Sequence, residues 1–233
     1  MAHVFRFFLP VSSEDLAVDN TVLLAPDDAK RLHKVLRLEA GESVEIADGR
    51  GRVFIATVVN PRSGEVVLGE EVLGQHLLVP IRVLLAQSGP RADDAVEKLV
   101  ELGVAEISPL LACGRRREAR TDRWQRIAEG AAAQAKLVMI PTIGAPVTYH
   151  DALVPGAIVC SHEHDDSSLS DALAGLSPPI TLLIGPEAGF SDEELGAAQQ
   201  AGVPIVRFGQ TVLRTETAAV VFAALVIDRL SSR

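Results

Sequence analysis

The pattern of apolar and polar positions changes about one third of the way along the chain. Up to residue 74, short alternating runs are separated by glycine-containing turns, which is typical of a small β-rich module such as a barrel. Asp48-Gly49 stands between two such runs and predicts a tight hairpin. From residue 75 onward, continuous apolar runs alternate with helical patterns, which favours a mostly parallel α/β sheet. We therefore predict two domains, 1–74 and 75–233.

The second domain carries the clearest signals for individual elements. Continuous apolar runs predict buried strands at 81–86, 157–160, 180–184 and 203–208, and a further short strand from Ile107. Apolar spacings of three and four predict helices at 93–102, 124–138, 192–201 and 217–230. Gly103 is placed to end the first helix, and Ser191 with Glu194 predicts a capping box at the third. The last helix is apolar nearly all round, so we expect it to be buried on more than one side.

Composition narrows the class of protein. A chain of 233 residues is long enough for two domains, and its 48% apolar content is enough to give each a core. No uninterrupted apolar stretch approaches the roughly 18 residues of a membrane span, so none is expected. Cys113 and Cys160 lie far apart without metal-ligand spacing, which predicts a reduced, cytoplasmic protein. A net charge of −9 argues against a general nucleic-acid binder, because neutralising phosphates requires a basic surface.

One segment departs from this acidic composition. Between residues 115 and 126, six arginines stand against Glu118 and Asp122, which gives a local charge of +4. These arginines are Arg115, Arg116, Arg117, Arg120, Arg123 and Arg126. Such a segment either binds RNA phosphate or forms a solvated loop and helix face, and composition alone leaves both interpretations open.

Two loops have the composition of a ligand site. In the first, the predicted strand 180–184 runs directly into the sequence Gly-Pro-Glu-Ala-Gly at 185–189, and a capped helix follows. Gly185 and Gly189 would allow a sharp turn and the close approach of a ligand, although a plain strand-to-helix turn is the alternative. The loop matches neither the dinucleotide fingerprint GxGxxG nor a P-loop, because the Gly-Lys-Ser/Thr end is absent.

The second loop follows Gly209 and leads into the last helix. Arg214, Thr215, Glu216 and Thr217 cluster at the expected helix start, where unpaired N–H groups attract anions. The helix dipole also favours Glu216 there, so a capping role is the alternative for that residue. A capping role does not account for Arg214, because the helix dipole disfavours a positive charge at a helix start. A guanidinium beside a glycine loop usually holds an anion or neutralises developing charge.

Together these motifs resemble a known family. GPEAGF at 185–190, followed by GQTVLRTETA at 209–218, is similar to the C-terminal signature of the RsmE-type rRNA uridine-N3 methyltransferases of the SPOUT superfamily. The segments HKVLRLEAGE at 33–42, VEKLVELGV at 96–104 and RWQRIAEGAAAQA at 123–135 extend the resemblance over nearly the whole chain. The resemblance implies a PUA-like RNA-binding module at the N-terminus and a C-terminal α/β domain with a trefoil knot. It also implies a homodimer, S-adenosylmethionine as cofactor, and small-subunit rRNA or the ribosomal subunit as substrate.

The resemblance further implies which residues form the site. The cofactor-binding residues would be His162, Glu163, Ile184, Gly185, Pro186, Glu187, Gly189, Phe190, Gly209, Val212, Leu213, Arg214 and Thr217, with Ile184, Val212 and Leu213 as walls for the adenine. Arg214 would stabilise the negative charge that develops on uracil, and Glu187 or Glu216 would act as base or positioning group. RNA contacts would come from Arg6, His33, Arg37, Arg115, Arg116, Arg117, Arg120 and Lys136. No metal is expected.

Two positions depart from the family pattern. Ala188 stands where the family usually has glycine, and a cofactor cradle tolerates alanine if its φ is negative. Leu137 stands where the family usually has arginine, which removes one expected RNA contact. Lys136 would replace that charge without the bidentate geometry of a guanidinium.

Two other functions fit parts of the sequence. A different nucleotide-binding α/β enzyme could use the GPEAG loop, and a non-enzymatic RNA-binding or ribosome assembly factor could use the N-terminal module and the arginine segment. His162 and His164 also lie close to Asp165 and Asp166 in the sequence. We interpret that cluster as an exposed loop rather than a metal site.

Overall fold

The computed structural model describes residues 4–9, 16–73, 78–86, 90–112, 121–163 and 167–231. The chain forms two compact units, the first made of residues 1–77 and 129–140 and the second of 78–128 and 141–233. The predicted division between residues 74 and 75 lies beside the first of these junctions. Nothing in the sequence pattern indicated that 129–140 would join the N-terminal unit.

The first unit contains a five-stranded sheet in the order β1-β3-β4-β5-β2. Its strands are β1 (Arg6–Phe8), β2 (Thr21–Leu23), β3 (Ser43–Ala47), β4 (Arg52–Asn60) and β5 (Glu65–Leu73). β3 and β4 form the predicted hairpin, and Asp48 Oδ1 accepts from the backbone N–H groups of Arg50 and Arg52 at 2.7 and 3.0 Å. Gly49 lies in this turn at φ +72°, a conformation that favours glycine.

A short helical segment packs over the core of the first unit. α1 (Pro26–Lys30) continues directly into a π-helical turn, η1 (Arg31–Val35), which buries Leu32 against Phe7, Phe54 and other apolar residues of the sheet. The chain then turns sharply at Arg37, whose φ of +54° is unusual for a side chain with a Cβ. A closed PUA-like barrel in this unit stays a prediction.

The second unit contains a seven-stranded sheet with the main order β12-β10-β11-β6-β7-β8, in which β9 also pairs with β7. Every pairing is parallel, which confirms the prediction of an α/β fold with a mostly parallel sheet. Its strands are β6 (Val79–Leu85), β7 (Val104–Leu111), β8 (Thr142–Ile143), β9 (Val147–Thr148), β10 (Ala157–Cys160), β11 (Ile180–Ile184) and β12 (Ile205–Val206). The bounds of β10 and β11 match the predicted runs. β7 begins three residues before Ile107, and β12 is much shorter than the predicted strand 203–208.

Helices cover both faces of this sheet. The described helices of this unit are α2 (Pro90–Glu101), α4 (Tyr149–Ala152), α5 (Leu169–Ala174), α6 (Asp192–Gln200) and α7 (Thr215–Ser231), and α3 (Thr121–Gln134) is divided between the two units. α4 and α6 pack on one face over Leu84, Val159 and Leu183, while α7 packs with α2 and against β6 and β11. Within the described residues, no helix combines the length and apolarity needed to cross a membrane.

Capping residues define the helix ends. The capping box of Ser191 and Glu194 is present at α6, and Gly103 has φ +79° two residues after the end of α2, so both predictions are confirmed. α3 begins and ends a few residues before the predicted helix 124–138, and α7 begins at Thr215 rather than Thr217. α7 therefore starts within the RTETA motif itself.

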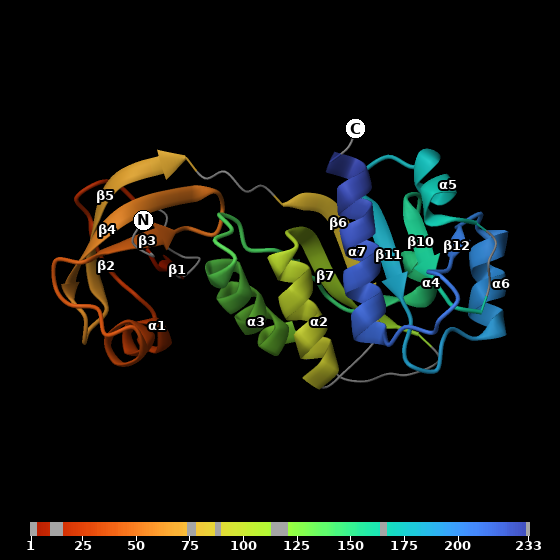
Figure 1. Ribbon diagram of the computed structural model, residues 1–233, viewed down its shortest axis with the longest axis horizontal. Coiled ribbons are helices and arrows are strands. Elements are labelled where there is room, and N and C mark those ends of the chain that lie inside the picture. The colour runs from red at the N-terminus through yellow and green to blue at the C-terminus, as the bar shows by residue number, and fades with distance from the viewer. Residues whose placement is uncertain are drawn as a thin grey trace. The chain divides into compact units, whose positions relative to one another are not determined.

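The path of the chain places one group of loops together. β10, β11 and β12 are parallel, so the loops that follow them lie at the same edge of the sheet. From the edge strand β12, the chain continues into α7, which packs against the central strands β6 and β11 (Figure 1). The GPEAG loop and the loop before α7 therefore meet.

Candidate active site

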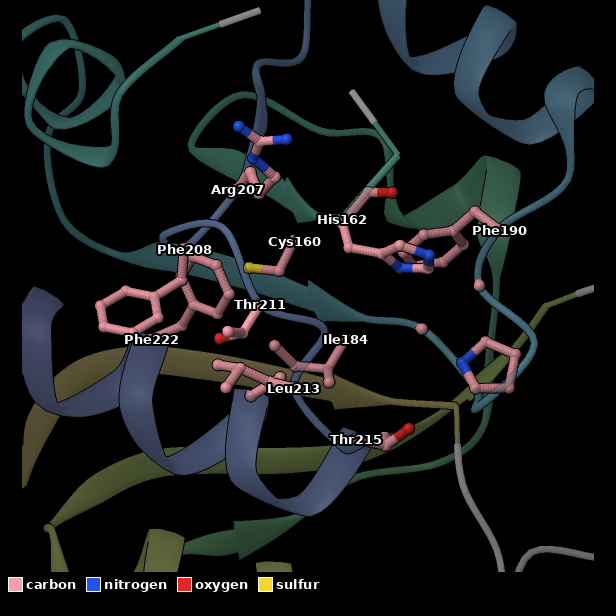
Figure 2. Close-up of a pocket in the computed structure, with 15 residues that line it drawn as sticks. Cys160, His162, Ile184, Phe190, Arg207, Phe208, Thr211, Leu213, Thr215 and Phe222 are labelled. Carbon is pink, nitrogen blue, oxygen red and sulfur yellow. The ribbon is translucent and has the colours of Figure 1, made fainter. Parts of the chain in front are cut away.

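A pocket lies at the carboxyl ends of β10, β11 and β12 (Figure 2). Its empty volume is about 500 Å³, counting the open mouth, which is within the usual range for small-molecule sites. Its lining residues are Cys160, Ser161, His162, Ile184, Gly185, Pro186, Gly189, Phe190, Arg207, Phe208, Thr211, Leu213, Thr215, Ala218 and Phe222. Both loops singled out in the sequence contribute to it.

The GPEAG loop is held in a tight arrangement. A Cβ at Gly185 would lie 3.0 Å from the ring of Phe190, so a larger residue would displace that ring. Phe190 is buried and packs on Tyr149 of α4, with 5.3 Å between the ring centroids. Gly189 has φ +76°, whereas the neighbouring Ala188 is not among the residues with positive φ. Ala188 therefore meets the condition, a φ that is not positive, under which a cofactor cradle tolerates alanine in place of glycine.

The loop after β10 closes onto the GPEAG loop. A Cβ at Gly189 would lie 3.3 Å from Glu163 Oε1, and His162 Nε2 lies 3.8 Å from the same oxygen. Glu163 and His162 are both exposed, so this pair is open to water and to a ligand. Behind them, burial raises the pKa of the Cys160 thiol, which keeps the sulfur neutral in the pocket wall.

The start of α7 forms the opposite wall. Thr215 is buried and lines the pocket, and Ala218 and Phe222 follow on the same face of the helix at spacings of three and four. Leu213 and Thr211 line the pocket from the preceding loop. In Figure 2, Thr215 and Leu213 face His162 and Phe190 across the pocket.

The predicted cofactor-binding residues fall into two groups. Those that line the pocket are His162, Ile184, Gly185, Pro186, Gly189, Phe190 and Leu213. Those that do not are Glu163, Glu187, Gly209, Val212, Arg214 and Thr217. Val212 is 69% exposed, which does not fit an adenine wall within a single chain.

Sequence reasoning missed several lining residues, although some signals were available. Ser161, Arg207 and Phe208 directly follow strands or strand ends at the carboxyl edge of the sheet, where ligands bind in open α/β folds. Thr215, Ala218 and Phe222 share one helix face, which could be recognised once the helix start was placed at Thr215. Cys160 and Thr211 carried no comparable signal.

The three predicted catalytic residues lie around the pocket rather than in it. Arg214 is exposed at the N-terminal end of α7, and its carbonyl accepts from the Ala218 N–H at 2.8 Å. Glu187 is exposed in the GPEAG loop. Glu216 Oε2 is buried in the first turn of α7, with no hydrogen-bond partner among the described residues. An acid left without such a partner beside the pocket is a candidate for proton transfer.

Arg6 and Lys136 are engaged in packing within the first unit. Arg6 has a side chain only 8% exposed, pairs with Glu45 at 3.0 Å and donates to the carbonyls of Lys136 and Leu137. Leu137 is buried, so its side chain is a core residue. This arrangement favours a structural role for Arg6 over the predicted RNA contact. Lys136 is half-buried at φ +55°.

His33 and Arg37 line a separate hollow on the first unit. It is formed by His33, Lys34, Arg37, Leu38, Glu39, Ala40 and Pro61 and has an empty volume of about 900 Å³ with its open mouth. Lys34 and Arg37 are exposed there. Basic side chains around an open hollow suit the binding of a phosphate backbone.

Two features of the sequence lie partly outside the described residues. They are the arginine segment, at Arg115, Arg116, Arg117 and Arg120, and the cluster at His164, Asp165 and Asp166, and Cys113 also lies outside. Within the part of the chain that is described, no group of three or more His, Cys, Asp or Glu residues could hold a metal ion.

Comparison with known proteins identifies the family. Residues 78–227 match the model of the RNA methyltransferase domain. The ribosomal RNA small subunit methyltransferase E of Synechocystis sp. is 30% identical, over 98% of this chain and 80% of that protein. The chain belongs to the ribosomal RNA small subunit methyltransferase E family. The resemblance recognised in the GPEAGF and RTETA motifs is thereby confirmed.

Solved structures of the methyltransferase E family and its relatives share this fold. The Neisseria gonorrhoeae enzyme of the same name, bound to S-adenosylmethionine, is 30% identical with a TM-score of 0.83, over 97% of this chain and 98% of that chain. A Legionella pneumophila protein described as a methyltransferase, in complex with the same cofactor, is 26% identical with a TM-score of 0.84, over 98% of both chains.

Proposed function

We propose that this chain transfers a methyl group from S-adenosylmethionine to N3 of a uridine in small-subunit ribosomal RNA. The observation that carries the proposal is the pocket formed by the GPEAG and RTETA loops at the carboxyl ends of β10, β11 and β12. It occurs in a member of the methyltransferase E family, and a family structure with 30% identity holds S-adenosylmethionine.

The residues present fit this cofactor. Gly185 and Gly189 keep side chains out of the space beside Phe190 and Glu163, so backbone groups can approach a ligand closely. Leu213, Phe208 and Phe222 supply apolar surface, and His162 supplies a polar group, with Glu163 Oε1 at 3.8 Å from its Nε2. When bound, S-adenosylmethionine supplies an electrophilic methyl group on a sulfonium centre.

The chain's own residues would handle the charge and the proton of the acceptor. Uracil N3 carries a weakly acidic proton, and its removal places negative charge on the ring oxygens. Arg214, exposed at the N-terminal end of α7, would stabilise that charge. Glu216 or Glu187 would act as the general base that takes the proton, or as a positioning group. Between them we favour Glu216, because its Oε2 is buried without a hydrogen-bond partner among the described residues.

The first unit would bind the RNA. We assign a PUA-like role to residues 1–74, with His33 and Arg37 at the basic hollow as contacts and Lys136 as a further one. Arg115, Arg116, Arg117 and Arg120 would add phosphate contacts to an otherwise acidic protein. The methyltransferase domain would comprise residues 75–233.

Three finer features complete the proposal. A trefoil knot is supported by the path from edge strand β12 to α7, which packs back against β6 and β11. A homodimer is supported by exposed apolar side chains at Val212 and Leu225. A cytoplasmic location is the one in which the ribosomal substrate would be encountered.

A methyl-transfer assay tests the function directly. The chain would be incubated with labelled S-adenosylmethionine and either free small-subunit rRNA or intact subunits, and the modified base would then be mapped. We expect one labelled uridine carrying the methyl group on N3. RNA binding without any transfer would favour an assembly factor, and the absence of S-adenosylmethionine binding would favour a different nucleotide-binding enzyme.

A further inference from the structure

The hollow on the first unit lies in a stretch of unusual backbone. η1 (Arg31–Val35) is a π-helical turn, a conformation that is rare and is found frequently at functional sites. Two residues after it, Arg37 has φ +54°, which persists in a residue with a Cβ only where the surrounding structure holds it. His33 and Lys34 of η1 line the hollow together with Arg37. The unfavourable conformation therefore coincides with a cavity, which points to a binding site there.

The lining of this hollow combines two kinds of surface. Its apolar members are Leu38, Ala40 and Pro61. Its two permanent cations, Lys34 and Arg37, are both exposed, and neither forms an ion pair or a side-chain hydrogen bond among the described residues. Glu39 adds one carboxylate, so these residues together remain net positive. The hollow therefore offers apolar area for a flat group and free positive charge for an anion.

A nucleotide of unpaired RNA presents the same two kinds of surface. Its base has flat faces that can leave the stack and pack against side chains, and its phosphate is an anion. In a duplex the base faces are stacked inside the helix, so only phosphates, sugars and base edges can be contacted. A hollow with an apolar lining and a cationic lining thus fits an unpaired nucleotide better than a duplex.

We propose that the hollow is a subsite for one unpaired nucleotide of the RNA substrate. The base packs against Leu38, Ala40 and Pro61, and the half-buried ring of His33 adds a surface for stacking. The phosphate pairs with Lys34 and Arg37. The first unit would then select an RNA loop or single strand near the target uridine. This inference rests on the proposed function, because it assumes that the substrate is RNA.

Fluorescence anisotropy of the full chain with two labelled RNAs tests the subsite. One probe is a single strand of about 16 nucleotides, and the other is the same strand paired with its complement. Ala40→Gln places a longer polar side chain at the apolar lining without changing the charge, at a position that is exposed. It should weaken binding of the single strand roughly tenfold, because packing of one base is lost, and should leave duplex binding unchanged.

A second variant separates the phosphate from the base. Lys34→Ala should weaken both RNAs and lower the salt dependence of binding by about one phosphate contact. Ala17→Gln is the matched control for Ala40→Gln, since Ala17 is an exposed alanine of the same unit that does not line the hollow. It should bind both probes as the wild type does. Thermal melting of each variant shows whether the fold has changed.

Several results would overturn the inference. Equal losses for both probes in Ala40→Gln would make the hollow a phosphate site that does not bind a base. Unchanged binding of both would remove the apolar lining from RNA recognition, and an equal loss in Ala17→Gln would indicate a general effect on the unit. If the wild-type chain bound neither probe, the subsite would fail together with the RNA-binding role of the first unit. Methyl transfer to intact subunits would still test the proposed function separately.

Discussion

Arg214 is the residue whose removal should affect the chemical step most specifically. It lies exposed at the N-terminal end of α7, beside the pocket but outside its lining, where it could reach the acceptor base. Arg214→Ala should therefore fold and bind S-adenosylmethionine normally. Its methyl-transfer rate should fall roughly a hundredfold or more, because one lost contact to developing charge typically costs that much. Single-turnover transfer, cofactor calorimetry and thermal melting on the same preparation measure all three properties.

Two further variants sharpen the test of Arg214. Arg214→Lys should recover little activity, because an ammonium does not reproduce the planar guanidinium fork. Arg229→Ala, at an exposed arginine in the last turn of the same helix, should leave the rate unchanged. If Arg214→Ala lost cofactor affinity or stability in step with activity, Arg214 would only hold the loop. Normal turnover would remove it from the mechanism.

At the residue scale, the sequence identified the loops better than the individual contacts. Gly185 and Gly189 could be found because glycines between a strand and a helix mark close approaches, and the structure places both at the pocket. Phe208 and Phe222 resemble ordinary core residues in the sequence, so only the fold reveals that they line a cavity. Arg6 was predicted to contact RNA. Its partners within the chain lie up to 131 positions away, so the sequence around Arg6 does not reveal them.

In the turn after η1, Arg37 combines an unfavourable backbone conformation with a basic side chain at the hollow of the first unit. Arg37 has φ +54°, which costs a residue with a Cβ about 1 to 2 kcal/mol. Arg37→Gly should relieve that cost, and after the extra chain entropy of glycine the free energy of unfolding should rise by up to about 1 kcal/mol. RNA binding should weaken at the same time, because the guanidinium at the hollow is lost. Urea unfolding and an RNA-binding titration measure the two effects.

Asp19 offers a control for this variant. It has φ +69° in the same unit and does not line the basic hollow. Asp19→Gly should leave RNA affinity essentially unchanged, since it removes no basic group. If Arg37→Gly bound RNA as tightly as the wild type, Arg37 would be no RNA contact. A stability lower than that of the wild type would mean that the side chain itself holds the turn.

The strength of the local pattern decided which parts of the fold could be predicted. β10 and β11 are uninterrupted apolar runs and α6 is well capped, and their predicted bounds are right or nearly right. α4 and α5 were missed, although Thr148 and Ser168 cap them just as Ser191 caps α6. Helices of four and six residues are too short to show a period of 3.6 residues in the sequence. A capping residue alone, without such a period after it, does not predict a helix.

At the scale of the whole molecule, the hydrophobic periodicity of the sequence predicts neither the order of the strands in the sheet nor the association of chains. The buried runs of β6, β10 and β11 look alike, and nothing in them specifies that β11 lies between the other two. α7 was expected to be buried on more than one side. The structure packs it on α2, β6 and β11, yet Leu225 remains 39% exposed. Val212, in the loop before α7, is a second exposed apolar residue, and a partner copy would bury both.

The last prediction is therefore that the chain is a homodimer whose contact includes α7. Sedimentation at micromolar concentration should give about twice the monomer mass of 24.8 kDa. Leu225→Asp should shift the equilibrium toward monomer, because an unpaired carboxylate in an apolar contact cannot be hydrated there. Val154→Asp, at an exposed apolar residue after α4, is the matched control and should stay dimeric. A wild-type chain that sediments only as monomer would contradict the prediction, whereas a dimer unaffected by Leu225→Asp would place the contact on another surface.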